Sequence, residues 1–438
     1  MTARKLAFTV LKTARDGATY SNIAIDNALK RNELSDADAG LLTAIVMGVT
    51  ERRLTLDYVI DRLSARPESV DADARVLLQM GIYQVMYLDR IPEYAAVNET
   101  VELSPGRCRG FVNAVLREFL RKKKSGKLGL LFPDEKADPE EYLSVYYSFP
   151  RDVCRTFTLL YGVDRTKRIF ELFNRPPRLT LRINTLKISR SEYAALLDER
   201  AIPYILSERL ENAIILERVG FSDLPGFDEG YFFVQDEASQ ICVEAVDARP
   251  GMRMIDACAC PGSKSFGCAI KMENQGEVLS FDLHESKLKL IDKSAARLGI
   301  GIVTAAVRDG RNFDASLEET ADRVLCDVPC SGLGVIAKKP EIRYKSLADF
   351  QRLPEIQLAI VENCARYVKR GGVLVYSTCT VLPEENEKNL LRFLEKHPEF
   401  TPVDFTVGDV KSERGMLSLA PDLHGTDGFF VAKLIKNE

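Results

Sequence analysis

Apolar residues recur at three- and four-residue steps through about the first 125 residues. One example is the set Leu6, Val10 and Leu11. A second is the set Leu41, Leu42, Ile45, Val46 and Val49. This spacing places apolar side chains on one face of an α-helix. Ser35, followed by acidic residues, is typical of a helix N-terminus, where its hydroxyl accepts a backbone N–H and the acids meet the helix dipole. The pattern predicts an all-α domain over residues 1–130.

A basic run at residues 121–127 follows the last of these helical patterns, and a polar, proline-containing stretch covers residues 132–141. We interpret the two as a linker with a basic edge. A solvated helix end, whose lysines only keep the chain soluble, is an equally good interpretation.

Residues 142–240 mix two periodicities. Residues 178–183 alternate like a β-strand, residues 190–200 have helical spacing, and residues 213–217 and 231–234 are short apolar runs. This mixture predicts a small α/β domain.

From residue 241 to residue 438, apolar strands alternate with helical stretches. The predicted strands cover residues 252–257, 278–283, 302–307, 324–328, 372–377 and 429–435, and two of the helices cover residues 287–298 and 356–368. Alternation of this kind is typical of a doubly wound, Rossmann-like parallel sheet. The chain is therefore predicted to be a multidomain protein with this α/β domain at its C-terminal end.

Composition adds little to this picture. The chain has 438 residues and a formal net charge of -4, so an RNA or DNA partner would need a local basic patch. Its 10 cysteines lack the regular spacing of a disulfide framework. No apolar run is long enough for a membrane span, and the first residues do not resemble a signal peptide. We expect a cytoplasmic protein with free thiols and no membrane partner.

An acid or a cysteine stands at or just past the end of each of the first five strands of this domain. These residues are Asp256, Asp282, Asp309, Asp327 and Cys379. Ligands of open α/β sheets bind at the carboxyl ends of the strands. One such acid could simply cap a helix or form a turn, but the repetition favours a binding site.

The loop after the first strand is rich in small residues. It contains Cys258, Ala259, Cys260, Pro261, Gly262, Ser263 and Lys264. Small residues allow close backbone approach to a ligand, and a following helix N-terminus adds N–H donors. Because the loop matches neither the dinucleotide nor the phosphate-binding fingerprint, it favours an amino-acid-like or nucleoside-like ligand. Asp282 is placed to accept ribose hydroxyls, and Asp309 could hold an adenine edge.

Two cysteines stand out from the others. Cys330 lies in the segment 327–332 and Cys379 in the segment 376–380, and their neighbours are Pro, Ser, Thr and Gly. Such surroundings favour exposed, reactive thiols rather than buried, inert ones. A metal site is not expected, because paired C-x-x-C motifs are missing and the three histidines are isolated.

Together these segments closely resemble the RNA 5-methylcytosine methyltransferases of the NOL/NOP/Sun family, and within it the ribosomal RNA branch called RsmB or Sun. The matching motifs follow the family order at residues 182–187, 234–239, 256–265, 327–332, 377–380 and 427–434. The helical N-terminal region is similar to the NusB-type RNA-binding fold, which favours this branch over the tRNA enzymes. Cys260, Ser263 and Ser265 depart from the family loop, which has Ala, Gly and Thr there.

The resemblance implies transfer of a methyl group from S-adenosyl-L-methionine to C5 of a cytosine in small-subunit (16S) ribosomal RNA. By analogy with the family, Cys379 is the nucleophile that adds to C6, Cys330 assists product release, and Asp327 contacts the pyrimidine near N3. The cofactor would be held by residues 258–264 together with Asp282, Asp309 and Asp327. We expect a monomer without a metal.

Three alternatives remain open from the sequence. The first is a tRNA cytosine-5 methyltransferase with the same chemistry. The second is a non-catalytic, RNA-binding ribosome assembly factor that keeps the fold. The third is a redox or metal-binding protein that uses the clustered cysteines.

Overall fold

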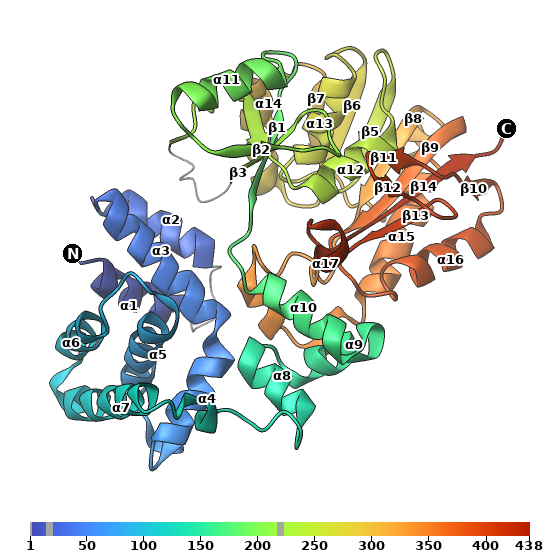
Figure 1. The fold of residues 1–438 in the computed structure, drawn as a ribbon. Coiled ribbons are helices and arrows are strands. Elements are labelled where there is room, and N and C mark those ends of the chain that lie inside the picture. Colours follow the sequence, from blue (N-terminus) through green and yellow to red (C-terminus); the bar gives the residue numbers. More distant parts are fainter. Residues whose placement is uncertain (1, 15–20, 217–222) are drawn as a thin grey trace. The chain divides into compact units, whose positions relative to one another are not determined.

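The computed structural model describes residues 2–14, 21–216 and 223–438 (Figure 1). The chain divides into two compact units. One unit comprises residues 1–175 and 336–347, and the other comprises residues 176–335 and 348–438. The first unit is therefore assembled from two separate stretches of the chain.

The first unit is helical, as predicted. Its α-helices are α1 (Ala3–Ala14), α2 (Ser21–Arg31), α3 (Asp36–Glu51), α4 (Arg53–Leu63), α5 (Ala72–Tyr87), α6 (Glu93–Leu103), α7 (Gly106–Lys124), α8 (Pro139–Tyr147), α9 (Arg151–Tyr161) and α10 (Val163–Phe173). Helix α5 packs against α3, α4, α6 and α7 and is buried along most of its length. Ser35 caps α3 by accepting a hydrogen bond from the Asp38 N–H at 3.2 Å, which confirms the predicted helix start.

The basic run at residues 121–127 is not a linker over its first half. Helix α7 continues to Lys124, so the first four basic residues form its last turn. Cations at this end interact favourably with the helix dipole. A short 3-10 helix, Leu128–Leu131, follows and buries Leu131. The linker interpretation is therefore wrong for residues 121–124.

Three further helices, α8 to α10, occupy a region where the sequence pattern predicted no elements. Aromatic residues hold them together, and the rings of Phe149 and Phe170 stack with their centroids 3.9 Å apart. A short 3-10 helix, Pro340–Tyr344, from a distant part of the chain completes this unit. Its fully buried Arg343 donates to the Asn174 side chain at 2.8 Å and to the Glu51 carbonyl at 3.1 Å.

The second unit begins with a small antiparallel sheet in the order β2-β3-β1-β4. Its strands are β1 (Leu179–Ile183), β2 (Tyr204–Leu206), β3 (Ala213–Leu216) and β4 (Phe232–Val234). Helix α11 (Arg190–Glu199) starts with a capping box and buries Tyr193 and Leu197 in the same core as Leu181 and Ile183. The predicted small α/β region is thus present, although the last residue of the predicted strand 213–217 lies outside the described residues.

A large mixed sheet forms the rest of the second unit, in the order β10-β14-β9-β8-β5-β6-β7 with β13 beside β14. Its strands are β5 (Arg253–Asp256), β6 (Glu277–Asp282), β7 (Val303–Val307), β8 (Ala321–Asp327), β9 (Val368–Thr378), β10 (Phe400–Pro402), β13 (Met416–Leu419) and β14 (Phe429–Lys436). Strands β5 to β9 pair in parallel, and β14 runs antiparallel to β9. The predicted Rossmann-like sheet is confirmed.

Helices cover both faces of this sheet. They are α12 (Glu237–Val246), α13 (Ser263–Lys271), α14 (Glu285–Leu298), α15 (Leu353–Ala365) and α16 (Glu387–Lys396). Three further short elements lie outside these layers: helix α17 (Pro421–His424) and a two-stranded ribbon of β11 (Thr406–Val407) and β12 (Val410–Lys411). Successive residues of β5 pack on opposite faces of the sheet: Met254 packs with α12 to α14, whereas Ile255 packs with α15 and α16. Because both faces are buried, the central strands are almost continuously apolar.

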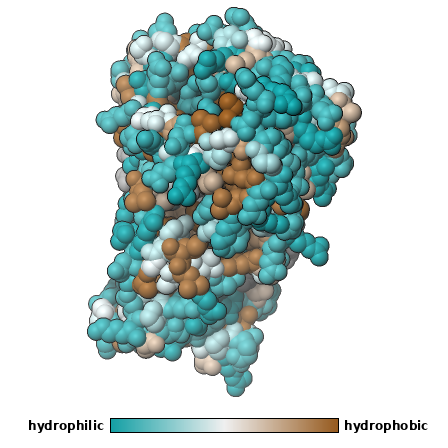
Figure 2. All heavy atoms as spheres, turned by 90° about the vertical axis from the view of Figure 1, so that its right-hand side faces the viewer, coloured by the Kyte–Doolittle hydropathy of each residue, from teal (hydrophilic) through white to brown (hydrophobic). Residues whose placement is uncertain are grey.

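Hydrophilic residues cover most of the face drawn in Figure 2, and hydrophobic residues lie there in separate areas. None of the helices described by the structure is both long and apolar enough to cross a membrane.

Candidate active site

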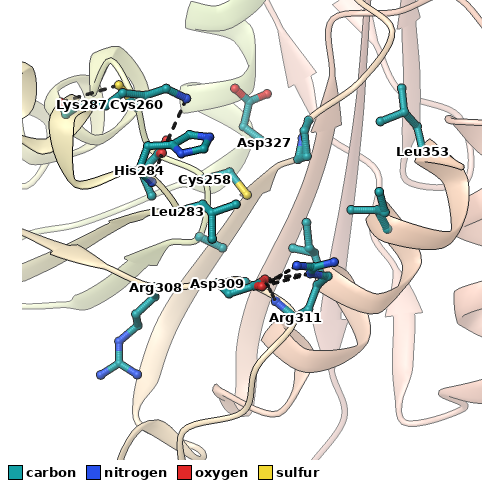
Figure 3. Close-up of a pocket in the computed structure, with 16 residues that line it drawn as sticks. Cys258, Cys260, Leu283, His284, Lys287, Arg308, Asp309, Arg311, Asp327 and Leu353 are labelled. Carbon is teal, nitrogen blue, oxygen red and sulfur yellow. Dashed lines mark hydrogen bonds and ion pairs between the residues drawn. The ribbon is translucent and has the colours of Figure 1, made fainter. Parts of the chain in front are cut away.

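The carboxyl ends of β5 to β8 border a cavity of about 430 Å³ (Figure 3). Five residues predicted from the sequence to bind a ligand lie in its wall. They are Cys258, Cys260, Asp282, Asp309 and Asp327. The fold therefore brings together side chains that are spread over 70 residues, because parallel strands end at the same edge of a sheet.

The other predicted residues of the loop after β5 do not border this cavity. They are Ala259, Pro261, Gly262, Ser263 and Lys264. Gly262 has a φ of 103°, and a Cβ there would lie 2.4 Å from the Phe266 ring, so only glycine fits this turn into α13. The loop shapes the helix start, and Lys264 reaches a different neighbour.

The acids after β6 and β7 already have protein partners. Asp282 accepts the backbone N–H of His284 at 3.0 Å, and the Lys287 ammonium lies 3.7 Å from it. Asp309 pairs with the Arg311 guanidinium at 2.6 Å, and Figure 3 shows the two side chains facing each other. The hydrogen bond from Arg311 lowers the pKa of Asp309. Both carboxylates thus serve as turn formers while they border the cavity.

Asp327, in the cavity wall, forms an ion pair with Lys264 at 2.5 Å. The other carboxylate oxygen of Asp327 accepts the Ser377 hydroxyl at 2.8 Å. Burial acts to lower the pKa of Lys264, but the charge and hydrogen bond of Asp327 together with the nearby thiols Cys242 and Cys379 outweigh burial, and the pKa lies above its ordinary value. Lys264 is therefore a cation, and its charge also interacts with Cys379.

Cys330 and Cys379 lie side by side, with their sulfur atoms 3.2 Å apart. Both are half-buried. They do not border the cavity themselves, but Pro329, the residue before Cys330, does. The hydrogen bond with Cys379 and burial raise the pKa of the Cys330 thiol well above its ordinary value. Cys330 therefore keeps its proton at neutral pH.

A buried carboxylate fixes the loop that carries Cys330. Glu385 accepts the Ser331 backbone N–H at 2.9 Å and the Gln357 side-chain amide at 2.7 Å. The Ser331 hydroxyl also lies 2.6 Å from the Thr380 hydroxyl, which belongs to the residue after Cys379. These bonds connect the two cysteine loops directly.

Close backbone packing gives a second connection between the loops. The Gly334 N–H donates to the Cys379 carbonyl at 3.0 Å, and the Gly428 N–H donates to the Gly334 carbonyl at 2.9 Å. A Cβ on Gly334 would lie 1.8 Å from the Gly428 carbonyl oxygen, so a side chain cannot be accommodated there. The role of Gly334 could not be found from local sequence pattern, since its partner lies 94 residues further along the chain.

Asp256, at the end of β5, is buried beneath the loop and does not border the cavity. One carboxylate oxygen accepts the Ser265 hydroxyl at 2.7 Å, and Ser265 in turn accepts the Ser280 hydroxyl at 2.8 Å. The other oxygen has no hydrogen-bond partner among the described residues. Burial raises the pKa of Asp256 to about 7.

The apolar wall of the cavity was not predicted from the sequence. Leu353, Ile356 and Ile360 of α15 form it, together with Leu283 after β6. The helix itself was predicted, and Ile356 and Ile360 are one turn apart on it. Which face of that helix borders the cavity depends on how the sheet packs, which the periodicity does not reveal.

Three family models match the chain in order. The NusB family matches residues 1–121, the ferredoxin-like domain of RsmF/B-like methyltransferases matches residues 150–220, and the 16S rRNA methyltransferase RsmB/F family matches residues 243–435. The chain is 37% identical to the probable ribosomal RNA small subunit methyltransferase B of Bacillus subtilis, over 99% of this chain and 98% of that relative. The chain belongs to the RsmB/F family of 16S rRNA methyltransferases. This result confirms the predicted family and the NusB-like first domain.

Other RsmB/F relatives and solved structures agree. The equally named protein of Synechocystis is 36% identical over 100% of both chains. The crystal structure of PH0851 matches 100% of this chain and 99% of its own with a TM-score of 0.81 and 28% identity. NSun6 from Pyrococcus horikoshii, solved with SFG, matches 68% of this chain and 100% of its own with a TM-score of 0.62. Its identity of 22% shows a shared fold alone.

Within the described part of this RsmB/F chain, no group of three or more His, Cys, Asp or Glu side chains is arranged to hold a metal ion. The chemical groups at the strand ends are instead the thiol pair of Cys330 and Cys379, the thiols of Cys258 and Cys260, one ion pair and three further carboxylates, at Asp256, Asp282 and Asp309. The site is thus suited to nucleophilic chemistry by sulfur.

Proposed function

We propose that this RsmB/F family member transfers a methyl group from S-adenosyl-L-methionine to C5 of a cytosine in 16S ribosomal RNA, through a transient bond between Cys379 and C6. The observation that carries the proposal is the pair of thiols 3.2 Å apart at the strand ends. The substrate class follows from the relatives, which are named ribosomal RNA small subunit methyltransferases B.

The strand-end cavity fits the cofactor. It offers the Asp282 and Asp309 carboxylates for hydroxyl and amino groups, and the apolar side chains of α15 for a flat ring. A volume of about 430 Å³ suits a nucleoside joined to an amino acid. NSun6, which shares the fold, was solved with SFG, an analogue of S-adenosylmethionine. When bound, S-adenosyl-L-methionine supplies an electrophilic methyl group.

Two neighbours of Cys379 favour its thiolate over its thiol. The cationic Lys264 interacts with Cys379, and a nearby positive charge stabilises a thiolate. Cys330, which keeps its proton, can donate its S–H to the Cys379 sulfur. This asymmetry supports Cys379 as the nucleophile and Cys330 as the group that acts later, in agreement with the roles carried over from the family.

The thiolate overcomes the weak nucleophilicity of cytosine C5. A bond from the Cys379 sulfur to C6 moves the ring electrons onto C5, which can then attack the methyl group, with S-adenosyl-L-homocysteine as the leaving group. The C5 proton is afterwards lost to a base, and the sulfur–C6 bond breaks, which restores the C5–C6 double bond. In this scheme Cys330 assists the elimination, and Asp327 holds the ring near N3. The base must be unpaired or leave its stack to reach these groups.

Methyl transfer from labelled S-adenosyl-L-methionine to protein-free small-subunit ribosomal RNA tests the proposal, with tRNA measured alongside. Nucleoside analysis should find the label as 5-methylcytidine in the ribosomal RNA. Label in tRNA alone would keep the chemistry and change the substrate. If the protein neither binds the cofactor nor transfers a methyl group, the proposal is contradicted and a role as an assembly factor is favoured.

A further inference from the structure

The helical unit has a cavity of its own, of about 500 Å³. Its wall consists of Arg52, Met86, Tyr87, Phe132, Tyr146, Tyr147, Glu171, Asn174 and Arg175. All of these residues belong to the first unit: Arg52 lies between α3 and α4, Phe132 follows α7, and the others lie at the ends of α5, α8 and α10. None of them takes part in the proposed methyl transfer.

Aromatic rings dominate this cavity. Tyr146 is 45% exposed, which is unusual for a large ring that has aromatic neighbours on several sides. Its ring stacks on Tyr142 at a centroid distance of 5.1 Å and meets the edges of Phe132 and Tyr147 at 5.9 and 5.0 Å. These neighbours hold the ring in a fixed orientation, so little conformational entropy would be lost when a flat ligand stacks on it.

Two arginines are positioned around the rings. The guanidinium carbon of Arg52 lies 4.9 Å from the centre of the Tyr87 ring, and only 17% of its side chain is exposed. Arg175 is 62% exposed and pairs with Glu171 at 2.9 Å, an ion pair that solvent can weaken easily. Guanidinium groups beside aromatic faces provide the two contacts that a nucleotide needs, one for phosphate and one for the base.

The basic end of α7 adds positive charge beside the cavity. The Lys123 ammonium donates to the Val85 carbonyl at 2.7 Å, just before Met86 and Tyr87 of the cavity wall, and it pairs with Glu93 at 2.9 Å. No ion pair involves Lys124 or Lys127 within the described ranges. The basic run that the sequence analysis noted therefore has cations available for phosphates.

We propose that this cavity binds one nucleotide of single-stranded RNA, with the base stacked among Tyr87, Tyr146 and Tyr147 and the flanking phosphates paired with Arg52, Arg175 and the end of α7. The inference rests on the proposed function, since it assigns a second contact to the same RNA substrate. Single-stranded bases expose their faces, whereas the bases of a duplex are already stacked. A groove for an apolar peptide helix would instead lack a buried guanidinium group such as that of Arg52.

Binding of a fluorescein-labelled eight-nucleotide oligouridine to the full chain, followed by fluorescence anisotropy, tests the inference. We expect Tyr146→Ala to weaken binding by about fivefold to a hundredfold, the range for loss of one base–aromatic stack. Tyr146→Phe should bind almost as the unchanged protein does, because it keeps the ring. Arg175→Gln should weaken binding and reduce the salt dependence by about one ion.

Matched controls lie in the same helical unit. Tyr94 is 71% exposed on α6 and outside the cavity wall, and Arg155 is an exposed arginine on α9. Tyr94→Ala and Arg155→Gln should leave binding unchanged. With ribosomal RNA as substrate, Tyr146→Ala should raise KM and leave kcat and the Kd for the cofactor unchanged.

Two results separate this inference from the proposed reaction. If Tyr146→Ala and Arg175→Gln bind oligouridine as tightly as the unchanged protein, the RNA assignment of the cavity is overturned in favour of a protein partner, even if methyl transfer is observed. If both variants lose oligouridine binding while no methyl transfer is found with the unchanged protein, the cavity assignment stands and the proposed reaction fails.

Discussion

The sulfur atoms of Cys330 and Cys379 lie 3.2 Å apart although 49 residues separate them in the chain. Their strands, β8 and β9, are parallel neighbours, so both cysteines follow the carboxyl end of a strand at one edge of the sheet. Bonds through Ser331 and Gly334 then fix one loop against the other. This geometry allows one thiol to donate a hydrogen bond to the other.

Cys379→Ala should abolish methyl transfer, because no sulfur would remain to add to C6. Labelled methyl incorporation into ribosomal RNA measures the loss, which we expect to be at least about a thousandfold. Cys154→Ala is the matched control and should keep its activity, because Cys154 is a buried cysteine on α9 of the helical unit, outside the site. Full activity of Cys379→Ala would exclude this cysteine as the nucleophile.

Cys330→Ala should trap a covalent protein–RNA adduct, because the elimination step loses its assisting thiol. Electrophoresis under denaturing conditions would show a slowly migrating species with the single variant, and none with the Cys330→Ala, Cys379→Ala double variant. Continued turnover by the single variant, without any adduct, would contradict the release role.

Lys264→Met should lower both activity and stability, since it leaves Asp327 without its cation. Only 11% of the Lys264 side chain is exposed, and loss of one partner from a buried pair costs about 3 kcal/mol. Lys271→Met removes a more exposed lysine from an ion pair with Glu244 and should cost less than about 1 kcal/mol. Denaturant unfolding of both variants checks this difference. An equal loss of unfolding free energy in the two variants would show that the Lys264–Asp327 pair stabilises the fold no more than the Lys271–Glu244 pair does.

The stability of the protein should fall between about pH 4 and pH 7 through Asp256. Burial raises its pKa from 3.8 to about 7, so within this window the folded state binds a proton that the unfolded state releases. The stabilisation is complete below the unfolded pKa and is lost as the pH rises through the folded pKa. Over the whole window it amounts to about 4 kcal/mol.

Asp256→Asn removes this titration while it keeps the shape of the side chain. Thermal unfolding at about pH 5 and pH 8 should therefore show a smaller drop in midpoint for the variant than for the unchanged protein. The same drop in both proteins would mean that Asp256 is ionised in the folded state already at the lower pH.

Arg343→Ala should destabilise the helical unit by about 3 kcal/mol. The fully buried guanidinium donates to the Asn174 side chain and the Glu51 carbonyl and lies 4.3 Å from the centre of the Phe149 ring. Its loss leaves the Asn174 side-chain oxygen without this donor, whereas the Glu51 carbonyl still accepts the Tyr344 hydroxyl. Arg366→Ala, at a half-exposed arginine, is the control for thermal unfolding and limited proteolysis. A thermal midpoint for Arg343→Ala as high as that of Arg366→Ala would show that residues 336–347 are not needed to hold this unit together.

Local patterns in the sequence determined much of this protein. The helical period of the first region, the Ser35 cap and the apolar strands ending in Asp256, Asp282 and Asp327 are all present in the structure. Such patterns record which face of an element is buried, and burial is what drives an amphipathic segment to form. The predicted boundaries of the three domains stay a prediction, as do the roles of the site residues.

Tertiary structure alone decided the rest. The helices α8 to α10 are joined by aromatic packing, and Arg343 reaches them from a segment more than 160 residues away. The sulfur pair and the apolar wall from α15 likewise depend on which strands and helices become neighbours. A periodicity states that one face of a segment must be covered, but the covering segment is chosen by the packing of the whole chain, which no local pattern contains.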